Sequence, residues 1–168
     1  FEIPNNLLEI WRSFYIRNYK NIDNWKKNSQ KITKTQDFKN YFSFTIPPEA
    51  KKIIMDFKSK HFKEKTNCAS RKASEKSLEV FTSIFENMVG GSADLTGSNN
   101  TKTKNMVPIT KDNYSGRYIH YGIREHAMAA VMNGLSLHGG IRPYGGTFLV
   151  FSDYCRPAIR LAAIMKLP

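Results

Sequence analysis

Apolar side chains near the start of the chain recur at helical spacing. From Leu7 to Tyr15 they fall three or four positions apart, as they do on one face of an amphipathic helix. The pattern predicts helix, in pieces, over residues 3–38, with Trp25 and Ile32 as the apolar anchors of its lysine-rich second half.

A second amphipathic segment follows two prolines that begin at Pro47 and interrupt the first pattern. Residues 49–62 place apolar side chains on one side of a predicted helix and lysines on the other. The polar residues 63–67 then separate two kinds of sequence. We therefore expect two domains, a helical and basic linker arm in residues 1–66 and an α/β domain in residues 67–168.

The second of these domains alternates between helix and strand patterns. The predicted helices are residues 71–85, 124–138 and 152–166, and the predicted strands are residues 87–91, 117–122 and 144–150. Residues 92–114 are predicted as a long polar loop, and Ser152 as the N-cap of the last helix. Such alternation predicts an α/β fold with a parallel sheet between helices. Three strands are few for this kind of sheet, so we expect it to be incomplete at its C-terminal end.

The net charge of the chain does not alter this predicted fold. The chain carries 26 Lys and Arg against 14 Asp and Glu, a net charge of +12. The excess is concentrated in residues 1–76, which hold 17 basic and 8 acidic side chains. These lysines are scattered rather than massed, and neither a zinc-finger spacing nor an aromatic RNA-binding signature accompanies them. We therefore expect a solvated basic surface and no nucleic-acid partner.

Several functional classes are disfavoured by the remaining composition. No run of the sequence is apolar enough to span a membrane, so no membrane partner is expected. Cys68 and Cys155 are spaced neither for a zinc site nor for a disulfide framework, which indicates a reducing compartment, the cytoplasm. The four histidines lack metal-ligand spacing as well, so no metal ligand is predicted.

Residues that could carry chemistry gather beyond the carboxyl ends of the predicted strands, where parallel sheets bind ligands. Residues 90–99 form a Gly- and Ser-rich turn that suits an anion, although such a turn is equally well purely structural. Glu125 begins a predicted helix, where a carboxylate is usually a partner of the helix dipole and becomes a proton donor only if buried. Phe148, Phe151 and Tyr154 are spaced by three, which is typical either of core or of a wall for a flat heterocycle.

Taken in order along the chain, five segments resemble transketolase. They are residues 69–74, 90–95 (Gly-Gly-Ser-Ala-Asp-Leu), 118–125 (Tyr-Ile-His-Tyr-Gly-Ile-Arg-Glu), 133–140 and 147–154. Their order and spacing are similar to the pyrimidine-binding domain of that family over residues 67–168. Residues 1–66 resemble, more loosely, the family's segment between its diphosphate-binding and pyrimidine-binding domains.

The resemblance implies a transferase of the pentose phosphate pathway that moves a two-carbon ketol unit between sugar phosphates, with thiamine diphosphate as cofactor. Glu125 resembles the catalytic glutamate that hydrogen-bonds the aminopyrimidine ring, where a buried acid favours the imino tautomer that takes the thiazolium proton. Phe148, Phe151 and Tyr154 match the aromatic wall around the pyrimidine, Asp94 matches an acid near the cofactor, and Arg71 and Ser98 match residues that hold the substrate phosphate.

Other parts of the family's site are missing from this sequence. The Gly-Asp-Gly motif that binds Mg²⁺ and diphosphate does not occur, and none of the four histidines matches a substrate-binding histidine of the family. We therefore expect Mg²⁺ to be held outside this chain, by the other subunit of a homodimer or by a complementing diphosphate-binding domain, and the isolated chain not to be catalytic. The alternatives are a stand-alone interaction protein or a complementing subunit derived from a transketolase. The expected fold is a partial parallel sheet of the thiamine-diphosphate-binding type, preceded by a helical arm.

Overall fold

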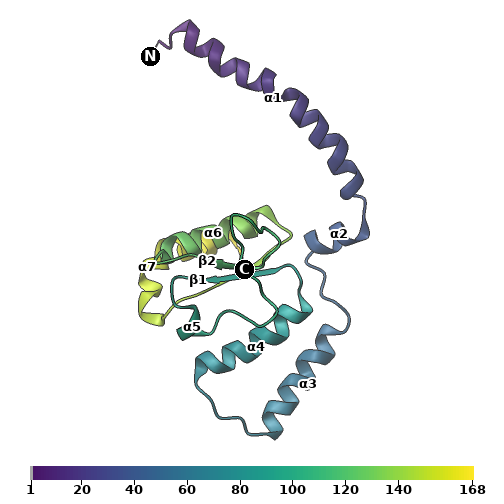
Figure 1. The fold of residues 1–168 in the computed structure, drawn as a ribbon, viewed down its shortest axis with the longest axis vertical. Helices are drawn as coiled ribbons and strands as arrows, with labels where there is room; N and C mark the ends of the chain where they lie inside the picture. The colour runs from purple at the N-terminus through teal and green to yellow at the C-terminus, as the bar shows by residue number, and fades with distance from the viewer. Residues whose placement is uncertain (1) are drawn as a thin grey trace. The chain divides into compact units, whose positions relative to one another are not determined.

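The computed structural model describes residues 2–168, which form two compact units that divide between Ser43 and Phe44. The first unit is helical and the second combines helices with a sheet (Figure 1). None of the helices in the described part of the chain combines the length and the apolar composition that a membrane crossing requires. The boundary between arm and domain that the sequence places after residue 66 stays a prediction.

The first unit consists of α1 (Asn5–Ile32) and α2 (Gln36–Phe42). Instead of several pieces, α1 is one unbroken helix of 28 residues. Pro4 lies immediately before it, where the fixed φ and the missing N–H of proline suit the start of a helix. Trp25 and Ile32, the expected apolar anchors, are both exposed, so the helix face to which they belong packs little of its apolar surface.

The second unit begins with two helices, α3 (Ala50–Lys63) and α4 (Ser70–Ile84), both within one residue of their predicted limits. The last carbonyl groups of α4 have no donor within the helix. The guanidinium of Arg117 supplies one, because it donates hydrogen bonds of 3.1–3.2 Å to three carbonyl oxygens at this end of α4. These bonds join α4 to the residue that precedes the second strand.

The sheet has three strands, β1 (Met88–Ser92), β2 (Tyr118–His120) and β3 (Arg142–Gly146), in the order β2-β1-β3. Both pairs are parallel, and Gly90 in the central strand lies opposite Tyr118 on one side and Tyr144 on the other. The predicted parallel sheet is therefore confirmed, and the carboxyl ends of all three strands lie at one edge.

The end of β3 and the start of the last helix differ from the prediction. β3 ends at Gly146 rather than at residue 150, and η1 (Leu149–Phe151) is a 3-10 turn that leads directly into α7 (Ser152–Met165). Ser152 is therefore the first residue of α7 and not its N-cap, and its hydroxyl donates to the Leu149 carbonyl oxygen at 2.6 Å. Short apolar runs fit a buried strand and a helical turn equally well, so periodicity could not separate the two.

Helices cover both sides of this sheet. α6 (Glu125–His138) and α4 lie on opposite sides of it (Figure 1), and α6 also packs against α7. α6 ends as predicted at His138, and the next residue, Gly139, has a φ of 81°, which glycine adopts readily. The predicted loop of residues 92–114 contains one short helix, α5 (Thr96–Asn99), which is too short to produce a hydrophobic period.

The two glycines of β1 leave room for tyrosine rings from the neighbouring segments. A Cβ atom at Gly90 would collide with the ring of Tyr144, and one at Gly91 with the ring of Tyr121. The aromatic rings thus occupy the space that side chains of the central strand would otherwise fill.

The tight fit at Gly90 generates a prediction about stability. Gly90→Ala should lower the free energy of unfolding by about 2 kcal/mol, because the added methyl group overpacks the space that the Tyr144 ring fills. The measurement is urea denaturation followed by circular dichroism.

The matched control is Gly134→Ala in α6, where no atom lies within 4 Å of the added Cβ. This change should raise the free energy of unfolding by about 0.5–1 kcal/mol, since alanine favours helix over glycine. Equal stability of the Gly90→Ala variant and the unchanged chain would show that the ring does not depend on this glycine.

Candidate functional site

Candidate residues follow each of the three strands. Asp94 lies two residues after β1, Glu125 follows β2 by a short turn, and Phe148 lies two residues after β3. Because the strands are parallel, these positions lie at the same edge of the sheet, the place where open parallel sheets bind ligands.

Glu125 is the buried acid of the site. The turn before it passes through Gly122, with a φ of 67°, and is closed by the Arg124 guanidinium, which donates to the Tyr121 carbonyl oxygen at 2.9 Å. Glu125 is 8% exposed at the first position of α6, and within residues 2–168 its carboxylate has neither a hydrogen-bond donor nor an ion-pair partner. Its carboxylate oxygens are open to the hollow that the residue lines, so a ligand there can donate a charge-assisted hydrogen bond to them.

Cys155 holds the backbone of Glu125. The buried Cys155 thiol of α7 donates to the Glu125 carbonyl oxygen at 3.3 Å. Burial, reinforced by the nearby Glu125 carboxylate, raises the pKa of this thiol, so it keeps the proton that it donates. No pattern in the sequence predicts this contact, because the two residues lie on different helices.

One hollow of 480 Å³ brings together four of the predicted site residues. We call it the ring hollow. Its lining residues are Ala93, Asp94, Leu95, Ile123, Glu125, Phe151 and Tyr154. Asp94 is exposed and adopts a φ of 63°, a conformation that few residues other than glycine take up and that is found more often at functional sites. The hollow thus combines apolar and aromatic walls with two carboxylates.

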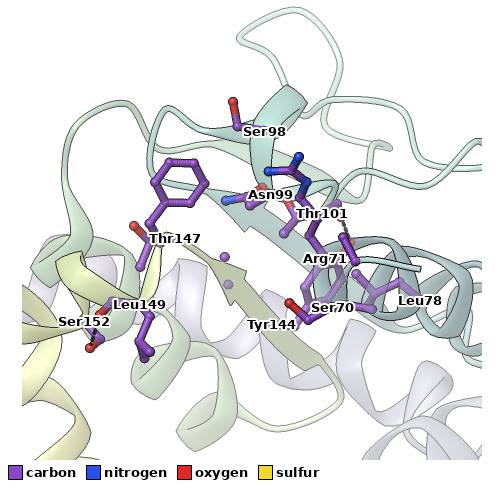
Figure 2. A pocket seen from close by; sticks show the side chains of 15 residues that line it. Ser70, Arg71, Leu78, Ser98, Asn99, Thr101, Tyr144, Thr147, Leu149 and Ser152 are labelled. Carbon is purple, nitrogen blue, oxygen red and sulfur yellow. Dashed lines mark hydrogen bonds between the residues drawn. The ribbon is translucent and has the colours of Figure 1, made fainter. Parts of the chain in front are cut away.

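A second hollow of 930 Å³ lies between α4, α5 and the segment after β3. We call it the hydroxyl hollow, since its polar lining consists of Ser70, Arg71, Ser74, Ser98, Asn99, Thr101, Tyr144, Thr147 and Ser152. Arg71 and Ser98, which both line it, come from different elements, α4 and α5 (Figure 2). Arg71 contributes a positive charge, whereas the ammonium of the neighbouring Lys72 is held by Glu75 at 2.7 Å. A guanidinium among hydroxyl groups is suited to an anion with several oxygens, such as a phosphate.

Three aromatic rings join the two hollows. Phe148 and Phe151 stack at 6.2 Å between ring centroids, and Phe151 and Tyr154 stack at the same distance. Their spacing of three therefore does put them on one side of a turn and helix start. Phe148 lines the hydroxyl hollow and the other two rings line the ring hollow, so the stack of rings extends from one hollow to the other.

Some lining residues were not predicted from the sequence. Tyr144, Thr147 and Asn99 line the hydroxyl hollow, but strand or loop residues of these types show no periodic pattern that marks a ligand site. The four histidines line neither of the two hollows. Within residues 2–168 no three His, Cys, Asp or Glu side chains cluster in a way that could hold a metal ion.

Comparison with known proteins points to a single family. Residues 66–168 match the family model described as transketolase, pyrimidine binding domain. Over the whole chain, the transketolases of Cereibacter sphaeroides and Sinorhizobium medicae are 46% and 43% identical, and the chain covers 25% and 24% of them. The chain therefore spans about a quarter of the length of these curated relatives.

Solved structures show the same relationship. Transketolase from Leishmania mexicana superposes with a TM-score of 0.66 and 33% identity, over 97% of this chain and 24% of that one. Transketolase from Pichia stipitis, in a complex with sedoheptulose-7-phosphate, gives a TM-score of 0.71 and 30% identity over 100% of this chain and 26% of that one. The parallel α/β fold expected from the sequence is that of these structures. The chain belongs to the transketolase family, and its residues 66–168 correspond to the family's pyrimidine-binding domain.

Proposed function

We propose that the chain supplies the pyrimidine-binding half of a thiamine diphosphate site in an enzyme that transfers a two-carbon ketol unit between sugar phosphates. The ring hollow would hold the aminopyrimidine, and the hydroxyl hollow would hold the phosphate of the sugar. The observation that carries the proposal is Glu125, a residue only 8% exposed, which lines the ring hollow and whose carboxylate has no partner in residues 2–168. The family membership of the chain and the sugar-phosphate complex of its Pichia stipitis relative support the proposal.

The residues of the ring hollow fit a flat, nitrogen-containing ring. Phe151 and Tyr154 offer aromatic surface, and Leu95 and Ile123 offer apolar surface. The polar side chains that line the hollow are those of Glu125, Tyr154 and Asp94, and Asp94 is exposed. A flat ring fits this hollow if one of its nitrogens donates a hydrogen bond to the Glu125 carboxylate and its faces pack against the aromatic side chains.

Glu125 is proposed as the catalytic acid of the site. Bound thiamine diphosphate supplies a nucleophilic carbon that takes up and releases the two-carbon unit. Glu125 would hold a proton between its carboxyl oxygen and the ring nitrogen, in a position set by the start of α6 and by the Cys155 thiol. Phe151 and Tyr154 would orient the ring and exclude water, and Asp94 would contact the cofactor from the opposite loop.

Arg71 and Ser98 are proposed to bind the substrate phosphate, and Phe148 is proposed to belong with Phe151 and Tyr154 to the aromatic wall around the pyrimidine. A guanidinium can donate two parallel hydrogen bonds to a phosphate, and a serine hydroxyl can donate one more. Because the sequence lacks Gly-Asp-Gly, we place Mg²⁺ and the diphosphate on a part outside this chain, in a homodimer or on a complementing domain. Both cysteines are free thiols, which supports a cytoplasmic location.

Glu125→Gln should lower kcat at least about a hundredfold without unfolding the protein, because an amide cannot exchange a proton with the ring. The protein to use is a chimera in which residues 1–168 replace the aligned segment of the Cereibacter sphaeroides transketolase. Ketol transfer by the unmodified chimera tests the proposed function itself, and a folded but inactive chimera would contradict it.

Glu9→Gln, at an exposed position of α1, is the matched control for the Glu125→Gln change. Near-normal turnover of the Glu125→Gln chimera would exclude the role assigned to this acid.

The isolated chain should bind thiamine diphosphate more weakly than a Kd of 1 μM, or about 8 kcal/mol, because it offers the ring pocket without the diphosphate anchor. Isothermal titration calorimetry with Mg²⁺ present is the measurement. Micromolar or tighter binding would show that these residues hold the whole cofactor by themselves.

Arg71→Ala in the same chimera should raise KM for the sugar phosphate about tenfold and leave kcat unchanged, since a phosphate contact far from the reacting carbons contributes uniform binding. Lys72→Ala is the control, because the Lys72 ammonium is bound to Glu75. Equal KM values for the two variants would place the phosphate elsewhere.

A further inference from the structure

One loop connects the two hollows. Residues 93–101 carry Asp94 into the ring hollow and Ser98 into the hydroxyl hollow, and they contain the four-residue helix α5. The N-cap of α5, Leu95, has no side chain that can accept a hydrogen bond from the helix. The conformation of the loop must therefore be fixed by contacts with residues around it.

Tyr118 of β2 supplies the central contact. Its side chain is 0% exposed, and its hydroxyl lies 2.9 Å from the Thr96 hydroxyl and 2.7 Å from the Thr101 hydroxyl. These two threonines stand at the start of α5 and just beyond its end. A single phenol thus holds both ends of the segment that carries Ser98.

The other end of the network is at β1. The Thr101 hydroxyl donates to the Asn99 amide oxygen at 2.9 Å, and the Asn99 amide nitrogen donates to the Ser92 hydroxyl at 2.9 Å. Ser92, which is 0% exposed at the end of β1, also accepts the Leu95 backbone N–H at 3.2 Å. The loop is thereby attached to Ser92 at the carboxyl end of β1 and to Tyr118, the first residue of β2.

The number of hydroxyl protons determines which group donates and which accepts in each of these hydrogen bonds. A hydroxyl has one proton, and that of Thr101 is used on the Asn99 amide oxygen, which can only accept. The Thr101 hydroxyl must therefore accept a hydrogen bond from the Tyr118 hydroxyl, and the Tyr118 hydroxyl in turn must accept one from the Thr96 hydroxyl. Tyr118 has to donate and accept at once, and a phenylalanine in its place can do neither.

Tyr144 holds the same segment independently. Its hydroxyl donates to the Thr101 carbonyl oxygen at 2.6 Å, and burial raises the pKa of this phenol, which keeps the donor protonated. The backbone at Thr101 therefore has a second attachment, whereas α5 is held on its sheet side by Tyr118 and Ser92. Loss of the Tyr118 hydroxyl should loosen α5 without unfolding the sheet.

We propose that Tyr118 is a positioning residue, whose hydroxyl fixes loop 93–101 so that Ser98 and Asp94 face their two hollows. The proposal rests on the function assigned above to the hydroxyl hollow. Tyr118 lines neither hollow and would touch neither ligand, so its effect on binding is transmitted entirely through Thr96, Thr101 and Asn99.

The test compares Tyr118→Phe with the unchanged chain of 168 residues in two measurements. The first is hydrogen exchange at the backbone amides of Ser98, Asn99 and Asn100. These amides donate hydrogen bonds to the carbonyl oxygens of Leu95 and Thr96. Exchange there should accelerate about tenfold, while α6 and α7 keep their protection. The second is titration with inorganic phosphate by NMR, in which Kd should rise about fivefold.

Two further changes guard against a trivial result. Tyr121→Phe is the matched control, because Tyr121 is a half-buried tyrosine whose hydroxyl has no hydrogen-bond partner in residues 2–168, and it should change neither measurement. Should Tyr118→Phe fail to fold, Thr101→Val removes the contact between Thr101 and Tyr118 together with the one between Thr101 and Asn99, and Thr101→Ser should restore the slow exchange.

The outcomes separate the positioning role from the proposed function. Unchanged exchange in α5 in both Tyr118→Phe and Thr101→Val would overturn the positioning role, whatever the phosphate affinity. Faster exchange in α5 with unchanged phosphate affinity would also overturn it, because the loop would then not set the binding site. If the unchanged chain binds no phosphate, the role assigned to the hydroxyl hollow fails, and with it the positioning proposal that rests on that role.

Discussion

The parallel pairing of β1 with a strand on each side is the constraint on which the candidate site depends. Strands that run in one direction end at one edge, so the segments after Ser92, His120 and Gly146 come together although they are far apart in the sequence. Gly90 and Gly91 of β1 carry no side chain, and the rings of Tyr144 and Tyr121 fill the space beside them. The chemistry at the edge of the sheet therefore relies on the absence of side chains in its centre.

Much of the fold could be predicted from the sequence, because strands and helices of different hydrophobic period alternate along it. The end of the third strand could not, since the apolar residues around Leu149 fit a strand and a 3-10 turn equally well. For Glu125 the sequence indicated a position at a helix start, but burial, which decides whether an acid is functional, requires the tertiary structure. The hydroxyl contacts of Tyr118 could not be predicted either, because their partners lie 17 and 22 residues away and polar loops have no period.

The two hollows differ in their physical character in a way that suits two different ligands. The ring hollow has apolar walls and a buried acid, so it favours a flat group that gives a proton and offers little charge. The hydroxyl hollow has one guanidinium and many hydroxyl groups, so it favours an anion with several oxygens. The stacked rings of Phe148 and Phe151 line the hydroxyl hollow and the ring hollow respectively, so aromatic surface is common to both.

The directional network around Tyr118 has a consequence for how this segment can change during evolution. Each hydroxyl donates a hydrogen bond to the next group. A single substitution at Thr96, Thr101 or Tyr118 therefore leaves a neighbour without its hydrogen-bond partner. Accepted changes must then arrive together, or a water molecule must replace the lost group. Such positions would vary slowly among descendants even where they never meet a substrate. Invariance at these positions would then reflect mutual dependence among neighbours and would be no direct guide to which residues perform the chemistry.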